Sequence, residues 1–148
     1  MLKYLGLAAA ISMMATAPAL ADPGACGDEP IPPAIPSVAD IGQRPPVDAQ
    51  KAKHQAFEDI KAWQTALKDY RDCLDSDTTT TKRQLQDAQS QSKPDKDKIT
   101  KLQGEITADA SVYDRTTNTE EKIVNDFHAL STAYCARPDT DKASCPKS

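Results

Sequence analysis

Residues 56–74, AFEDIKAWQTALKDYRDCL, decide the fold because apolar side chains recur there at alternating intervals of four and three residues. The apolar positions are Ala56, Ile60, Trp63, Leu67, Tyr70 and Leu74. This heptad spacing places them on one face of an α-helix that packs along another helix. Asp48 is the expected N-cap of this helix, because its carboxylate can accept a hydrogen bond from an open amide of the first turn.

A second run with the same periodicity follows an expected turn at residues 92–95. Its apolar positions are Ile99, Leu102, Ile106, Tyr113, Ile123, Phe127, Leu130 and Tyr134, with Asp109, Thr116 and Glu120 in the middle of the seam. Pro94 is tolerated in a first helical turn, and Ser92 with Asp95 resembles a capping box. The sequence therefore predicts an all-α protein in which residues 48–137 form a long antiparallel two-helix hairpin of coiled-coil type.

The two ends of this predicted hairpin differ in composition. Folding the helices back about Pro94 brings Ile60 opposite Phe127 and Trp63 opposite Val124, so apolar residues meet at the base, the end away from the turn. Residues 75–110 form a polar tip. Continuity of the first helix through residues 75–81 is left open, because short polar and β-branched side chains have poor helix propensity. Two helices bury only one stripe each, so a third layer is expected from the N-terminal segment or from a second copy of the chain.

Residues 22–47 precede the hairpin and hold most of the prolines. Pro30, Pro33 and Pro36 recur every three residues and would line one edge of a polyproline II helix. One interpretation is a ligand for a proline-recognising groove. The favoured interpretation is an extended strap, without regular secondary structure, packed on the protein's own helix. Residues 138–148 are expected to form a short C-terminal tail.

Residues 1–21 have the three-part pattern of a secretory signal peptide. Lys3 supplies a positive charge, an uncharged and mostly apolar run follows, and small residues precede a cleavage site between Ala21 and Asp22. The apolar run is shorter than the about 20 residues that span a bilayer. The pattern predicts a periplasmic or secreted protein.

All four cysteines lie beyond this signal: Cys26, Cys73, Cys135 and Cys145. An even number of cysteines in an oxidising compartment favours two disulfides. Cys135 and Cys145 are ten residues apart across a proline turn, and the N-terminal segment is long enough to return Cys26 to Cys73. Pairing of Cys73 with Cys135 is the alternative, disfavoured because it moves the fold-back point away from Pro94.

The N-terminal half carries a resemblance to a family. Cys26, the spaced prolines that follow it and a helix ending in Tyr70-Arg71-Asp72-Cys73-Leu74 are similar to a set of small proteobacterial periplasmic proteins. The resemblance covers about 50 residues. It implies a periplasmic location and a pair formed by Cys26 and Cys73, but no activity. Cys135, Cys145 and the long polar tip depart from it.

The sequence offers little chemistry. The chain has a net charge of −4, whereas a nucleic-acid-binding protein is expected to have a basic face. His54 and His128 are expected at the surface near the base, out of register with one another and without the tight cluster that a metal needs. The acidic stretches starting at Asp75 and Asp95 lack the glycine and glutamate of a calcium loop. No enzymatic activity, cofactor or small-molecule substrate is expected.

The resulting hypothesis is an exported structural or protein-interaction protein, acting as a homodimer or on another envelope protein. The alternative is a periplasmic chaperone-like or stress protein, or an inhibitor of an envelope enzyme. Trp63 and Tyr70 could anchor a partner, but their seam positions favour a place in the core.

Overall fold

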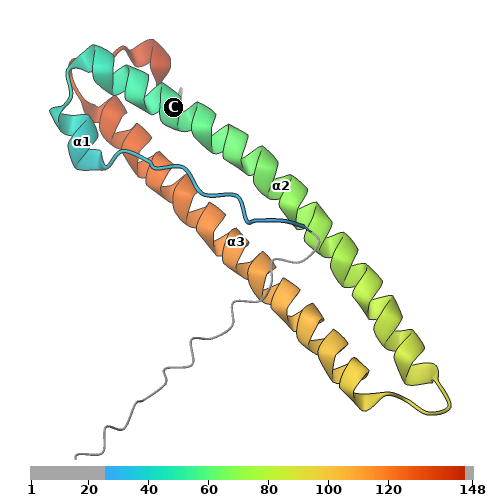
Figure 1. Ribbon diagram of the computed structural model, residues 1–148. Helices are drawn as coiled ribbons and strands as arrows, with labels where there is room; N and C mark the ends of the chain where they lie inside the picture. The colour runs from blue at the N-terminus through green and yellow to red at the C-terminus, as the bar shows by residue number, and fades with distance from the viewer. Residues whose placement is uncertain (1–25, 146–148) are drawn as a thin grey trace, which may run out of the picture.

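The computed structural model describes residues 26–145 of the 148-residue chain. Its elements are α1 (Val38–Gln43), α2 (Pro46–Ser90), α3 (Lys96–Ala136) and the 3₁₀ helix η1 (Lys142–Ser144). The long helices α2 and α3 lie side by side, as Figure 1 shows, and this part of the all-α prediction is confirmed. The expected signal peptide and its cleavage site between Ala21 and Asp22 lie outside the described residues.

The buried face of α2 follows the heptad pattern. Its buried apolar residues are Ala49, Ala56, Ile60, Trp63, Leu67, Leu74 and Ala88. Of the predicted seam, Tyr70 alone is half-buried. The helix is continuous through residues 75–81, and Thr81 is buried there, because tertiary packing outweighs a weak local propensity.

The core of the base is a cluster of Ile41, Ala49, Leu130 and Tyr134, each no more than 1% exposed. Ile41 comes from α1, a helix in the segment that was expected to have no regular secondary structure. That expectation was wrong because Ser37 caps a short helix. Figure 1 shows α1 beside the C-terminal end of α3, where it supplies part of a third layer.

The capping box of α1 is local to four residues. Ser37 Oγ accepts a hydrogen bond from Asp40 N at 3.1 Å, and the Asp40 carboxylate accepts one from Ser37 N at 3.1 Å. At the other end, the Arg137 guanidinium donates to the carbonyl oxygens of Ile41 and Arg44. Carbonyls at a helix C-terminus lack intrahelical partners, so Arg137 satisfies two of them and ties α1 to the end of α3.

Both predicted caps of the long helices were displaced. Pro45 occupies the N-cap of α2 without a side-chain hydrogen bond, and Asp48 lies within the first turn. Proline favours this start because its fixed φ suits the first turn and it has no amide hydrogen that needs a partner. In α3, Asp95 itself is the N-cap and accepts from Lys98 N at 3.1 Å, so Ser92 lies in the preceding loop.

Residues 26–37, here called the N-terminal segment, run over the two long helices from α1 toward the middle of α2 (Figure 1). Trp63 Nε1 donates to the Pro30 carbonyl at 3.1 Å, and Glu29 forms an ion pair with Arg115 of α3. Pro30, Pro33 and Pro36 are half-buried, whereas Ile31 is 89% exposed. The edge formed by these three prolines therefore faces the long helices.

Two disulfides fix the first and last residues of the described part of the chain. Cys26 is joined to Cys73 with a Cα–Cα distance of 5.6 Å, and Cys135 to Cys145 with a distance of 5.9 Å. The first attaches the N-terminal segment to the middle of α2, and the second attaches the tail to the end of α3. These are the two pairs that the spacing of the cysteines favoured.

Candidate functional site

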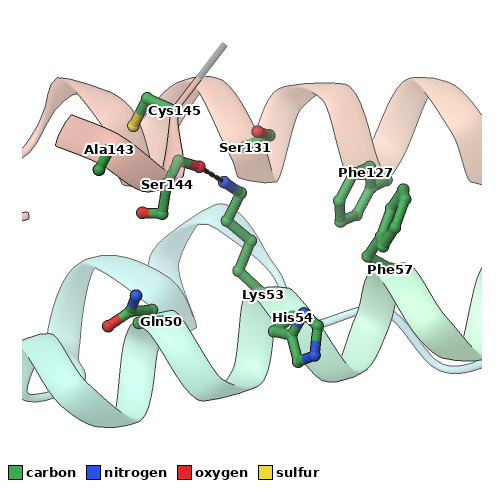
Figure 2. A pocket seen from close by; sticks show the side chains of 9 residues that line it. All are labelled: Gln50, Lys53, His54, Phe57, Phe127, Ser131, Ala143, Ser144 and Cys145. Atoms are coloured by element: carbon green, nitrogen blue, oxygen red, sulfur yellow. Dashed lines mark hydrogen bonds between the residues drawn. The ribbon is translucent and has the colours of Figure 1, made fainter. Parts of the chain in front are cut away.

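A hollow of about 530 Å³ lies at the base, where α2, α3 and η1 meet (Figure 2). Its lining residues are Gln50, Lys53, His54, Phe57, Phe127, Ser131, Ala143, Ser144 and Cys145. The rings of Phe57 and Phe127 face one another across the two helices, with their centroids 5.9 Å apart. Phe127 therefore contacts a ring one turn away from Ile60, the residue expected opposite it.

A second hollow of about 460 Å³ adjoins the first, since both are lined by Phe127, Ser131 and Cys145. It adds Val124, His128, Thr132 and Cys135 to the lining. Together the two hollows, with the residues that line them, are called the base groove. Phe57 is 44% exposed and Val124 36% exposed, so the groove has an apolar surface open to solvent.

Residues 143–145 of the tail form one wall of the base groove and are fixed at several points. Lys53 reaches from α2 and donates from Nζ to the Ser144 carbonyl at 2.6 Å, the dashed line in Figure 2. The same ammonium lies 4.9 Å from the centre of the Tyr134 ring, and the Tyr134 hydroxyl lies 3.2 Å from Ser144 Oγ. With the Cys135–Cys145 disulfide, these contacts give the wall a defined position.

The electrostatics of the base groove differ from those of the acidic chain around it. Within residues 26–145, neither Asp nor Glu lines it. Burial lowers the pKa of Lys53, because removing water destabilises its charged form. The acidic residues closest in sequence to the two phenylalanines have cationic partners, Glu58 with Lys61 and Asp126 with Lys122, and the Lys61 ammonium lies 5.2 Å from the centre of the Phe57 ring.

A polar layer crosses the middle of the helix pair. Arg71 of α2 donates from Nε to Thr116 Oγ1 at 2.9 Å and forms an ion pair with Glu120. Gln64 donates from Nε2 to Glu120 Oε1 at 2.8 Å, and Thr78 donates to Asp109 at 3.1 Å. The polar seam residues that the sequence marked on α3 are therefore the ones that bond across to α2. Along this layer, residues later in α2 bond to residues earlier in α3: Gln64 to Glu120, Arg71 to Thr116 and Thr78 to Asp109.

Glu120→Gln is expected to lower the free energy of unfolding by about 1–2 kcal/mol near neutral pH, because Arg71 loses its ionic partner while half-buried. The hydrogen bond from Arg71 lowers the pKa of Glu120, so its contribution is full above the unfolded-state pKa and is lost as pH falls through the folded-state pKa. Urea unfolding of both proteins from pH 7 downward measures this. A difference that stays constant with pH contradicts it.

Asp109→Asn is expected to raise the free energy of unfolding by about 0.5–1 kcal/mol at neutral pH. Burial, with Asp77 and Glu105 nearby, raises the pKa of Asp109, so its ionised form opposes folding above the folded-state pKa. The gain disappears below the unfolded-state pKa, where both states hold the proton. Thermal unfolding at neutral pH and at a pH below the unfolded-state pKa tests this, with Asp114→Asn at an exposed position as the control. A neutral-pH gain no larger than the control's contradicts it.

The other candidate residues from the sequence, His54, His128 and Trp63, do not come together in a site. His54 and His128 are exposed and line different hollows of the base groove. Among the residues that the structure describes, no group of three or more His, Cys, Asp or Glu is arranged to hold a metal ion. Trp63 is 6% exposed and belongs to the core. In the same part of the chain, no helix is both long and apolar enough to cross a membrane.

Sequence reasoning missed the base groove itself. Phe57 is an apolar residue outside the predicted α2 seam, and that mismatch was the available signal; Val124, which was expected opposite Trp63, is instead 36% exposed. A large apolar side chain on the polar side of a heptad helix either meets a further element or remains exposed. Both outcomes occur here, since Phe57 packs on Phe127 and stays 44% exposed.

No protein-family model, curated protein or solved structure matches this chain.

Proposed function

We propose that this chain is an exported, periplasmic protein-interaction protein without enzymatic activity, which presents its base groove to a partner protein. The observation that carries the proposal is the open apolar surface of the base groove, where Phe57 and Val124 remain 44% and 36% exposed. Exposed apolar patches bounded by polar residues mark interaction sites, and aromatic side chains dominate their binding energy.

The proposed architecture is an antiparallel helical hairpin with the N-terminal segment as a strap. The strap interpretation is supported by the disulfide at Cys26, the hydrogen bond from Trp63 to Pro30 and the ion pair of Glu29. With its half-buried proline edge already used, this segment is less available to a proline-recognising domain. The Cys135–Cys145 disulfide at the base keeps one wall of the groove ordered before a partner arrives, which reduces the entropy lost on binding.

Export is supported by the signal-like pattern of residues 1–21 and by the pairing of every cysteine of the chain. Disulfides persist in the periplasm and outside the cell and are rare in the cytosol. The resemblance of residues around Cys26 and Cys73 to small proteobacterial periplasmic proteins agrees with this location.

Photo-crosslinking in the living cell envelope tests the proposal. A photo-reactive amino acid replaces Thr132, an exposed residue of the base groove, or Gln86 on the polar tip as the matched control. The expected result is one dominant protein adduct from position 132 and none from position 86. Equal adducts from both positions, or none from either, overturn the proposal, and many unrelated adducts from position 132 favour the chaperone-like alternative.

A further inference from the structure

We infer that the base groove binds an apolar segment of a partner protein that also carries a carboxylate, with the apolar side chains against Phe57, Phe127 and Val124 and the carboxylate beside Lys53. This inference rests on the proposed function and specifies the chemistry of the partner. The partner is thus an acidic, amphipathic segment rather than a purely apolar or a basic one.

The shape of the base groove suits apolar side chains. Phe57 and Phe127 form a tilted pair with an interplanar angle of 35°, and Phe57 remains 44% exposed. Val124 continues the apolar surface one turn along α3, and the Cys135–Cys145 disulfide closes the other end. Volumes of about 530 and 460 Å³ are each large enough for one or more apolar side chains of a partner.

The charges lining the base groove are unbalanced toward cations. The chain has 22 acidic and 18 basic side chains, yet the described lining of the base groove includes Lys53, His54 and His128 and no carboxylate. Glu58 and Asp126, its acidic neighbours in sequence, already have cationic partners. An acidic segment therefore meets cations without competing carboxylates here, on a molecule whose net charge is negative, which favours this site and orients the segment.

Lys53 is placed to receive the carboxylate. A lysine ammonium has three donors, and the hydrogen bond to the Ser144 carbonyl uses one of them. Within residues 26–145, Lys53 has no salt-bridge partner, and burial lowers its pKa. A partner carboxylate would offset this desolvation by stabilising the charged form.

Fluorescence anisotropy on the oxidised, full-length mature chain tests the inference with labelled amphipathic peptides. The peptides share one apolar face and differ only in having glutamate, glutamine or lysine at the same two flanking positions. The expected result is that the glutamate peptide binds about fivefold more tightly than the glutamine peptide, and the lysine peptide most weakly. The preference should shrink at high salt.

Two pairs of variants locate the effect. Lys53→Gln should abolish the preference for glutamate, whereas Lys68→Gln, on the same helix and already paired with Asp72, should leave it intact. Val124→Ser should weaken binding of all three peptides, whereas Ile31→Ser, at an exposed apolar residue of the N-terminal segment, should not. Circular dichroism of each variant separates a binding effect from a loss of folding.

Each other occupant has its own signature. Equal binding of the three peptides with a Val124-dependent affinity overturns the inference but leaves the proposed function standing. Binding of dodecanoate without any peptide overturns it in favour of a small amphiphile, and Val124-dependent self-association of the protein overturns it in favour of a second copy. Absence of both peptide binding and the crosslink at position 132 overturns the inference and the proposed function together.

Discussion

Replacing Cys26 and Cys73 together with serine is expected to lower the free energy of unfolding by about 4 kcal/mol, the largest effect of any disulfide change in this chain. The bridge spans a sequence separation of 47 residues, against 10 for the Cys135–Cys145 bridge. A cross-link that closes a longer loop removes more conformations from the unfolded chain, so the shorter bridge is expected to contribute about 3 kcal/mol.

Urea unfolding followed by far-UV circular dichroism measures both effects. The Cys135→Ser/Cys145→Ser double variant is the matched control, because it also removes one bridge and two sulfur atoms. Retention of helix at low urea in both variants shows that the comparison concerns stability rather than failure to fold. A larger loss from the shorter bridge contradicts the argument from loop length.

Trp63→Ala is expected to lower the free energy of unfolding by about 3–5 kcal/mol. The indole is 6% exposed in the seam of α2, and its Nε1 donates to the Pro30 carbonyl of the N-terminal segment. Truncation therefore leaves a cavity between the helices and also leaves the Pro30 carbonyl without this donor.

Trp63→Phe separates the two contributions, since it keeps an apolar ring but removes the donor, and a loss of about 1–2 kcal/mol is expected from it. Chemical unfolding is followed by circular dichroism because this substitution removes the single tryptophan of the chain. Leu85→Ala, at a half-buried position of the tip, is the control for ordinary truncation. A loss from Trp63→Ala no greater than this control contradicts its assignment to the core.

The long helices could be predicted from the sequence because the evidence for them repeats. From Ala56 to Leu74 the period of the apolar residues directly records which face is buried, and the structure buries five of the six predicted positions. Asp109, Thr116 and Glu120 were marked as polar exceptions in the α3 seam, and each bonds to α2. The apolar period did not predict their partners on α2, because Arg71 and Gln64 lie beside the apolar stripe and not in it.

The features that the sequence did not predict depend mostly on contacts between segments that lie far apart in the chain. The helix α1 is six residues long and has one buried residue, Ile41, so it has no periodic signal. The base groove brings together Lys53 of α2, Phe127 of α3 and Ser144 of the tail, and no local pattern records this meeting. The N-cap of α2 was placed at Asp48 because propensity ranks aspartate highly, whereas Pro46 at the first helical position, after Pro45 as the N-cap, starts the helix earlier.

The order of the cysteines along the chain has a consequence for biogenesis. Each bridge joins a cysteine to the next one in sequence, Cys26 to Cys73 and then Cys135 to Cys145. If the chain is threaded through a translocation pore amino end first, an oxidase that links each thiol to its predecessor produces the native pairs directly. Maturation is then expected to proceed at the same rate in cells lacking a disulfide isomerase, with no shuffled intermediates to correct.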